Sequence, residues 1–401
     1  MLPVGALDEV QKGDRLMRKH SIVNKNQKTL TRKDTRQIRA MAAKQRLTIG
    51  LDLGDRTSRY CIVDEAGEVV SENSLPTTRG GLDSLFGKMP SSRVALEVGT
   101  HSPWVSRQLA AVGHQVIVAN AHKVKLITQS MRKNDRIDAR KLAWLARVDP
   151  ELLSPIRHRG EEAQADLAMI RARAELMEAR TKLINSARGL AKPMGERLKA
   201  CDADQVKEAL ADGLGEAVQR TIKPLLKIVE AMSEQIAVYD ERIEAMVKRY
   251  PEVVLLKQVY GVGTLIGLTF VLTIEDAGRF AHSRDVGCYL GLQPRQRESG
   301  ESAPELGISK AGDRLLRSYL VQASHCILRK GSPDSDLRAW GIAKAESGGK
   351  RAKRRAIVAV ARKLAVLLHR LWVTGEVYDP LYNRKAVERA AEGKGKVKVA
   401  A

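Results

Sequence analysis

The sequence predicts a mixed α/β domain on the N-terminal side, followed by a mostly helical remainder. Between residues 47 and 119, short apolar runs alternate in the manner of strands and are separated by turn residues. Between residues 160 and 250, apolar residues recur in steps of three and four, as they do along one helix face. Aromatic residues make up only 4% of the chain, which suits helices built from Ala and Leu. With 401 residues, the chain can hold two or three domains.

The chain is strongly basic, with 69 Lys and Arg against 47 Asp and Glu and a formal net charge of +22. Such a charge predicts a polyanionic partner, most simply nucleic acid. An anionic membrane surface is the competing partner, but no run of 18 apolar residues and no secretory signal is found. The four cysteines are far apart and form no CxxC pair. A zinc site or disulfide framework is therefore not expected, and the cytoplasm is the default compartment.

Both ends of the chain are basic. Residues 1–46 show little apolar periodicity and predict a mobile or partly helical arm, which is either an inert tail or a contact for phosphates. Residues 381–401 form a second basic segment, whose end from Arg389 is expected to be disordered. Between these ends we expect an α/β domain at 47–155, a helical region at 156–250 and a C-terminal domain at 251–380.

The α/β domain has a recognisable order of elements. Strands are predicted at 47–53, 59–63, 69–73, 93–99 and 115–119, and helices at 81–89, 102–112 and 135–147. The resulting order, β-β-β-α-β-α-β-α, resembles the ribonuclease-H-like fold, to which RuvC-type nucleases belong. In such folds, acidic residues sit on the first strand, at the end of the fourth strand and on the last helix.

Four acidic residues occupy these places: Asp52, Glu97, Asp135 and Asp138. The last two are three residues apart and so share one helix face. Each also has an ordinary interpretation: Asp52 as a turn cap, Glu97 as a partner of Arg93, the helical pair as a solvated surface. An acid within an apolar run is nevertheless costly unless it is paired or binds a metal. Carboxylates suit hard cations, and two such ions stabilise the attacking and leaving oxygens of a phosphoryl transfer. The four acids therefore predict a Mg²⁺ site.

The helical region predicts a long hairpin. Its second arm carries a coiled-coil seam over three heptads, formed by Val229, Met232, Ile236, Tyr239, Ile243, Met246 and Tyr250. The Gly- and Pro-containing stretch from Leu190 to Pro224 is interpreted as the connection between the arms. The hairpin either packs on itself or pairs with another subunit, and both alternatives remain open.

Two loops of the C-terminal domain are candidates for contact with nucleic acid. Gly261 and Gly263 lie between helices, in a turn that resembles a helix-hairpin-helix and would let a phosphate approach backbone N–H groups. A plain corner between two helices is the alternative. Further on, Ser299 follows Arg295 and Arg297 in a loop that begins at Pro294. A hydroxyl flanked by guanidinium groups suits attack on a phosphodiester, although an ordinary polar loop has the same composition.

The remainder of that domain is helical and basic. Ser309 is expected to cap a helix at 314–330, and an amphipathic helix is expected at 357–372. Just before the latter lies a dense basic segment that includes Arg351 and Arg354. Together with Arg295, Arg297, Lys310, Gly261 and Gly263, these arginines are the candidate residues for binding nucleic acid.

Taken together, these motifs resemble those of a known family, the IS110/IS1111-type transposases, also called bridge-RNA-guided or seek-RNA-guided DNA recombinases. The resemblance covers roughly residues 47–380 and depends on Gly50-Leu51-Asp52, Leu96 to Thr100, Asn134 to Ala143, Pro294 to Gly300, and Ile308 to Gly312. The sequence departs from the family in the basic arm before Leu47 and in the long helical middle.

The resemblance implies an activity and its partners. Ser299 would be the nucleophile that forms a phosphoserine link to a DNA strand end, and Asp52, Glu97, Asp135 and Asp138 would act with Mg²⁺ in the same composite site. Donor and target DNA would be selected by pairing with a structured non-coding RNA, in a homodimer or, at the synapse, a tetramer. The expected location is the bacterial cytoplasm, at the nucleoid when active. Such a protein would hold nucleic-acid backbones while the RNA reads the sequence.

Two other functions fit the same residues. One is a metal-dependent RuvC-type nuclease or resolvase in which Ser299 merely contacts phosphate. The other is a basic scaffold that binds RNA or DNA and has no catalytic activity.

Overall fold

The computed structural model describes residues 32–43, 45–120, 135–296, 306–349 and 351–385. The chain divides into two compact units, residues 1–159 and 160–401, here called the sheet unit and the helical unit. The boundaries expected near residues 46, 155, 250 and 380 remain predictions. None of the helices in the described part of the chain has the length and apolar character that a membrane crossing needs.

The sheet unit is built on one five-stranded sheet in the order β3-β2-β1-β4-β5. Its strands are β1 (Thr48–Asp52), β2 (Thr57–Val63), β3 (Val69–Pro76), β4 (Arg93–Glu97) and β5 (Gln115–Ala119). β1 pairs with β2, and β2 with β3, in antiparallel fashion. β1 pairs with β4, and β4 with β5, in parallel fashion. The C-terminal ends of β1, β4 and β5 therefore lie at one edge of the sheet.

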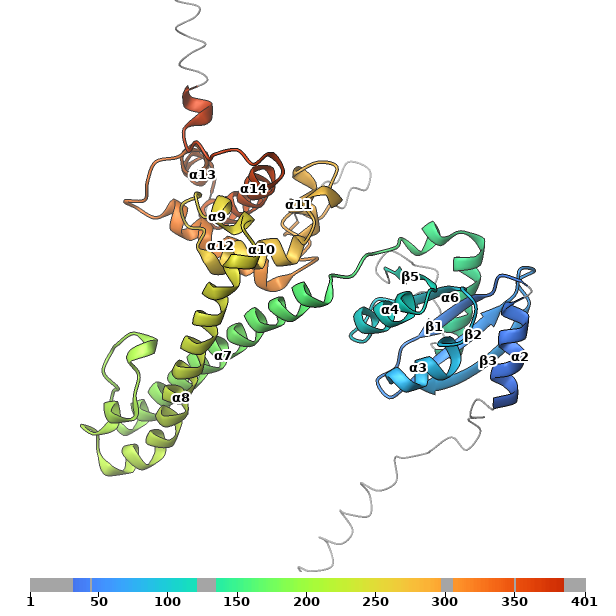
Figure 1. The fold of residues 1–401 in the computed structure, drawn as a ribbon. Helices are drawn as coiled ribbons and strands as arrows, with labels where there is room; N and C mark the ends of the chain where they lie inside the picture. Colours follow the sequence, from blue (N-terminus) through green and yellow to red (C-terminus); the bar gives the residue numbers. More distant parts are fainter. Residues whose placement is uncertain (1–31, 44, 121–134, 297–305, 350, 386–401) are drawn as a thin grey trace, which may run out of the picture. The chain divides into compact units, whose positions relative to one another are not determined.

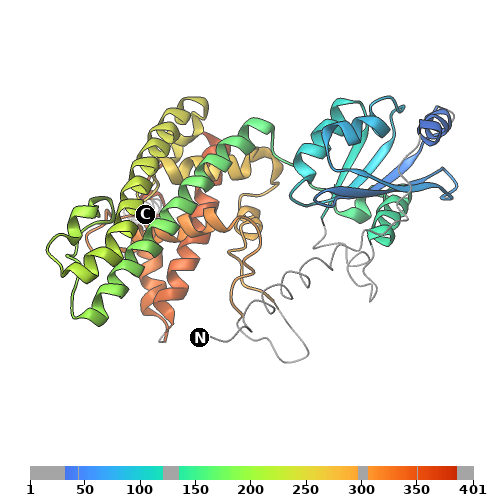
Figure 2. The same ribbon diagram turned by 90° about the horizontal axis from the view of Figure 1, so that it is seen from below.

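Helices cover both faces of this sheet (Figure 2). The first face packs against α3 (Arg79–Phe86) and α4 (Ser102–Ala111), with Ile49 and Leu51 of β1 in the shared core. The second face packs against α6 (Asp135–Val148). The order of these elements and most of their bounds are as predicted, and the expectation of an α/β domain is confirmed. A further helix, α2 (Arg32–Ala42), buries Ile38 in the core of the first face.

The helical unit begins with two long helices, α7 (Glu161–Ala191) and α8 (Glu216–Met246), which pack against each other as a hairpin (Figure 1). Four of the predicted seam residues are buried along α8, namely Val229, Ile236, Ile243 and Met246. The connection was expected to extend to Pro224, but this expectation is wrong, because Pro224 lies inside α8. The connection is shorter and contains three 3₁₀ turns, Lys192–Met194, Ala203–Gln205 and Glu208–Ala211.

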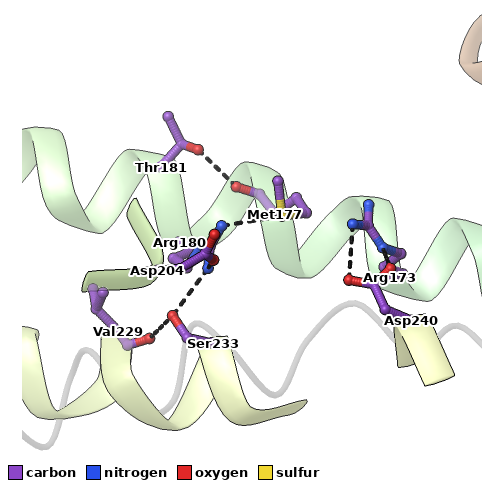
Figure 3. A network of polar contacts seen from close by, with 8 residues as sticks. All are labelled: Arg173, Met177, Arg180, Thr181, Asp204, Val229, Ser233 and Asp240. Carbon is purple, nitrogen blue, oxygen red and sulfur yellow. Dashed lines mark hydrogen bonds and ion pairs between the residues drawn. The ribbon is translucent and has the colours of Figure 1, made fainter. Parts of the chain in front are cut away.

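Polar contacts tie the two arms of the hairpin together (Figure 3). Arg173 of α7 holds Asp240 of α8 through two hydrogen bonds of 2.5 and 3.1 Å. Arg180 is 2% exposed, and its guanidinium donates to Asp204 of the connection and, over 3.0 Å, to Ser233 of α8. A buried guanidinium needs such partners, so the contacts of Arg180 fix the connection onto both helices.

The rest of the helical unit wraps around α10 (Thr264–Ile274), whose residues are nearly all buried. Around it lie α9 (Glu252–Leu256), α11 (Arg284–Tyr289), α12 (Arg314–Leu328), α13 (Asp336–Glu346) and α14 (Ala352–Thr374). The mostly helical remainder is thereby confirmed. Asp313, not Ser309, caps α12, because its carboxylate accepts a hydrogen bond of 2.8 Å from the backbone N–H of Leu316.

Candidate functional site

Asp52 and Glu97 end neighbouring strands at the same edge of the sheet. Leu51 of β1 is the register partner of Leu96 of β4, so the next residues, Asp52 and Glu97, follow side by side. Neighbouring parallel strands lie about 4.8 Å apart. Both side chains are half-buried and belong to the second face, because Gly50 and Ala95, two residues earlier, pack against α6. The fold therefore places two predicted acids next to each other.

The first turn of α6 lies over this pair. A Cβ on Gly50 would lie 2.5 Å from the backbone nitrogen of Ala143 and would also overlap the carbonyl oxygen of Ala139. Farther along α6, the carbonyl oxygen of Ala146 accepts a hydrogen bond of 2.7 Å from Arg93, the first residue of β4. The helix therefore runs antiparallel to β1 and β4. Its first residues point toward the carboxyl ends of these strands.

Helix and strand geometry place Asp138 at the same level as Asp52 along the direction of β1. Asp52 is two residues beyond Gly50, about 6.6 Å along the strand, a distance that a helix spans in about four residues. Because Gly50 is level with the turn from Ala139 to Ala143, Asp52 is level with the start of α6. Asp138 is half-buried there, and Asp135 is the first residue of the helix. The backbone thus brings all four predicted acids to one edge.

The described side chains do not by themselves form a complete set of metal ligands. No group of three or more His, Cys, Asp or Glu residues in that part of the protein is close enough to hold a metal ion. The side chain of Asp135, the fourth predicted ligand, lies outside the described residues. Carboxylates repel one another and are drawn together by a hard cation. The type and placement of these acids fit Mg²⁺, so the magnesium site stays a prediction.

Sequence reasoning missed Arg59. It is the register partner of Asp52 on β2 and shares the second face with Cys61, which packs against α6. Directly opposed residues have Cβ atoms about 4.5–5.5 Å apart. No described residue forms a hydrogen bond or ion pair with the half-buried Arg59 side chain. A guanidinium is therefore available beside the acids. The signal was the alternation of β2, which puts one charge on an otherwise apolar face.

A hydrogen-bonded histidine, His158, lies near the same edge of the sheet. Ser102, at the start of α4, is 2.8 Å from Nε2 of His158 and also donates to the carbonyl oxygen of Gly99 over 2.8 Å. Burial, together with the nearby charges of Arg107 and Arg159, lowers the pKa of His158 from its ordinary value. Through Ser102, the His158 ring anchors the loop that follows Glu97.

The helical unit contains a second candidate site, a basic groove of about 2030 Å³ along α13 and α14. Both described ends of the Ser299 loop line it, at Pro294–Gln296 and Leu306–Ile308. These ends are held together because Pro294 pairs with Ile308 and the N–H of Arg295 donates to the carbonyl of Gly307 over 3.1 Å. Ser299 and Arg297 lie outside the described residues. The loop that carries the predicted nucleophile therefore starts and ends in this groove.

Four of the predicted nucleic-acid-binding residues meet in the basic groove, namely Arg295, Lys310, Arg351 and Arg354. Among its described lining residues, nine are Lys or Arg and three are Asp or Glu. Gly261 and Gly263 do not line it. Gly261 has a φ of +87°, and a Cβ there would lie 3.0 Å from the carbonyl oxygen of Ala323 in α12, so this glycine serves close helix packing.

Lys310 is held at the base of the Ser299 loop by backbone contacts. Its φ is +57°, a strained value for a residue other than glycine. Its N–H donates to the carbonyl of Gly291 over 3.0 Å, and Gly291 and Gly312 both have positive φ and no room for a Cβ. The tight packing of these turns fixes the backbone from which the Lys310 side chain enters the groove.

Comparisons with known family models match two separate parts of the chain. A family model described as a transposase matches residues 49–193, and one described as the transposase IS116/IS110/IS902 family matches residues 253–338. The first match includes all four predicted acids, and the second includes the Ser299 loop. Both halves of the chain are therefore those of a transposase.

Similar proteins give the same class. The transposase for insertion sequence element IS1111A of Coxiella burnetii is 29% identical over 82% of this chain and 90% of its own length. A probable family 20 transposase of Pseudomonas aeruginosa is 28% identical over 73% of this chain and 87% of its own. The transposase for insertion sequence element IS1328 of Yersinia enterocolitica is 25% identical over 70% and 84%. This chain belongs to the IS110/IS1111 family of transposases.

Proposed function

We propose that this transposase cleaves and exchanges DNA strands through a serine–DNA intermediate, assisted by a metal bound to Asp52, Glu97, Asp135 and Asp138. The main support is the placement of Asp52 and Glu97 at the ends of paired parallel strands, beneath the first turn of α6. The strand order β3-β2-β1-β4-β5, antiparallel on one side and parallel on the other, is that expected of a ribonuclease-H-like fold. We therefore assign the sheet unit to the RuvC-like group.

The proposed cleavage and rejoining of strands needs no external energy source. The Ser299 hydroxyl oxygen attacks phosphorus, a P–O bond to Ser299 forms, and the P–O bond to the departing strand end breaks. The serine proton leaves to solvent or a base, and the departing oxygen is protonated. Mg²⁺ bound by the acids would polarise the phosphate and favour ionisation of the hydroxyl. Because the phosphodiester energy is kept in the serine link, attack by another strand end reverses the step and joins strands.

Basic residues would hold the reacting phosphate. Arg295 and Lys310 flank the Ser299 loop in the basic groove, where their charges offset the charge that develops on the phosphoryl oxygens. Arg59 would contact the DNA phosphate at the acid site, because one guanidinium can donate hydrogen bonds to two phosphate oxygens at once. The acids and Ser299 would meet within one chain or across two subunits.

A guide RNA and a multimer complete the proposal. The excess of cations in the basic groove supports binding to phosphate backbones, and selection of DNA by a structured RNA would explain a protein that recognises backbone rather than sequence. The hairpin of α7 and α8 is the candidate coiled-coil element for pairing in a dimer or tetramer.

A strand-exchange assay on purified protein with donor DNA, target DNA, co-purified RNA and Mg²⁺ tests this function. We expect Asp52→Asn, Glu97→Gln and Asp138→Asn each to abolish cleavage while nucleic-acid binding persists. Glu151→Gln, on the exposed surface of the same unit, is the matched control and should retain activity. Removal of Mg²⁺ with a chelator should have the effect of the acid variants.

Denaturing gels separate the serine mechanism from its alternative. Wild type should yield a covalent protein–DNA species that Ser299→Ala lacks. Full cleavage by Ser299→Ala, with no adduct from wild type, would instead indicate a metal-dependent nuclease. Full activity of all three acid variants would refute the metal site.

A further inference from the structure

We propose that the basic groove binds a single-stranded segment of nucleic acid, whose bases stack on aromatic side chains beside the Ser299 loop. This inference rests on the proposed function and names the form of nucleic acid that the groove accepts. Grooves for single strands combine cations that follow the backbone with aromatic rings that stack on bases. The basic groove has both features.

Aromatic side chains are concentrated in the groove. The whole chain has only four Trp, eight Tyr and three Phe, yet Trp340, Tyr378 and Tyr382 all line this groove. Tyr382 is 58% exposed, so most of its ring is accessible to a ligand. Trp340 and Tyr378 are partly buried and pack against the hydrophobic core, as Phe280 does. Tyr382 is not among the residues of that core, so its ring is available for a role beyond folding.

Each of two rings has a cation beside it. The guanidinium carbon of Arg370 lies 5.9 Å from the ring centre of Tyr382, and Nζ of Lys363 lies 4.4 Å from that of Trp340. In a nucleotide, base and phosphate are joined through one sugar. A base stacked on Tyr382 therefore places its phosphate within reach of a neighbouring cation, and the groove matches the alternation of base and phosphate along a strand.

The carboxylates of the groove are already engaged by other groups. Glu376 pairs with Arg370 over 3.3 Å, Asp379 pairs with Lys385 over 3.0 Å, and Asp336 accepts a hydrogen bond of 2.6 Å from the backbone N–H of Asn383. Their charges are therefore partly offset at the rim that carries Tyr382. Arg351 and Arg354 also line the groove and are exposed, so the groove remains attractive to a polyanion.

Size and shape favour a strand over a small ligand or a duplex. The groove volume of about 2030 Å³ is at least twice the roughly 300–1,000 Å³ of small-molecule sites. A duplex presents its phosphates outward and keeps its base faces stacked inside, so exposed rings would find no base to stack on. Unpaired nucleotides can stack their bases on the rings while their phosphates contact the cations.

Fluorescence anisotropy on the full-length protein tests the inference with three probes of equal length, namely oligo-dT, oligo-U and a DNA duplex. We expect Tyr382→Ala to weaken binding of the single strands by about 5- to 100-fold and to leave duplex binding unchanged. Tyr382→Phe, which keeps the ring, should bind as wild type does. Tyr260→Ala is the matched control, because Tyr260 is 49% exposed and is not a groove residue.

The comparison of probes decides every outcome. Equal losses on single strands and duplex, or no loss for Tyr382→Ala, would overturn the inference. Loss with oligo-dT alone would assign the groove to DNA, and loss with oligo-U alone to RNA. Because binding is measured without cleavage, it can be repeated in an Asp52→Asn background. Failure of the groove inference is then distinct from failure of the proposed chemistry.

Discussion

Gly50 of β1 and Ala139 of α6 meet backbone to backbone, and this contact sets the height of α6 above the sheet. A Cβ on Gly50 would overlap the Ala139 carbonyl oxygen and crowd the Ala143 nitrogen. Neither backbone atom can rotate away as a side chain would. The approach is what brings the first turn of α6 down to the ends of β1 and β4.

Gly50→Ala should lift α6 and separate the acids. Overpacking against backbone costs about 2 kcal/mol or more, so we expect a lower free energy of unfolding and loss of DNA cleavage. Urea unfolding and the strand-exchange assay measure the two effects. Gly80→Ala in α3 is the matched control, since a Cβ there meets nothing within 4 Å and Ala favours a helix. If Gly50→Ala were as stable and active as Gly80→Ala, the role of this contact would be refuted.

Arg59→Gln should slow cleavage by about 10- to 100-fold, the worth of a charge-assisted hydrogen bond to phosphate. The guanidinium also repels a cation held by Asp52, so its removal should lower the Mg²⁺ concentration needed for half-maximal cleavage. A residue that served only folding would change the melting temperature instead. Arg59→Lys should recover part of the rate, and Arg79→Gln, on the exposed start of α3, should behave as wild type. An unchanged rate for Arg59→Gln would exclude the phosphate contact.

Asp204→Asn should destabilise the hairpin although Asp204 itself is exposed. The substitution leaves the Arg180 guanidinium buried and without its carboxylate, and breaking such a pair is costly. Because the Asp204 side chain is 79% exposed to water, we expect a loss of about 2 kcal/mol in denaturant unfolding, below the roughly 3–5 kcal/mol for breaking a fully buried pair. Asp212→Asn removes the ion pair between Asp212 of the same connection and Lys223 of α8. The Lys223 side chain is 31% exposed, against 3% for Arg180, so this variant should cost less than about 1 kcal/mol. Equal effects of the two variants would contradict the role of burial.

Stability should fall as the solution is acidified below the ordinary pKa of histidine, about 6.5. Burial lowers the pKa values of His114 and His158 in the folded protein. Between the lowered and the ordinary values, the unfolded chain therefore binds more protons, and the free energy of unfolding decreases as pH drops. Thermal unfolding between pH 7.5 and 5 measures this slope. His158→Asn should flatten the slope, whereas His282→Asn at an exposed position should not. Identical slopes for all three proteins would show that His158 does not contribute.

The strands and the acids could be predicted because they depend on local pattern. Alternation marked β1, β2 and β5 to within a few residues, and their order fixed which strand ends share an edge. That order alone was enough to bring Asp52 and Glu97 together. The role of Arg59 required the register between β1 and β2, which periodicity does not encode.

Features that depend on tertiary packing could not be predicted. Pro224 was expected to lie in the connection between the arms. Instead α8 begins at Glu216 and continues through Pro224, because Ile222 and Leu226 on either side of it are buried in the hairpin core. α13 has apolar residues on several sides and gave no clear helical stripe. The basic groove unites the Ser299 loop with α13, α14 and the segment that follows them. Its residues are far apart along the chain and come together only in the fold.

The packing of α10 has a consequence during synthesis. The ring of Phe270 meets that of Trp372 with centres 6.4 Å apart, and these residues are separated by 372 − 270 = 102 positions. At about 5–20 residues per second, a ribosome needs roughly 5–20 s to supply that partner. During this interval the apolar helix α10 lacks part of the packing that covers it in the folded protein. Nascent chains and C-terminal truncations should therefore depend on chaperones, and the yield of folded enzyme should be set by translation as well as by sequence.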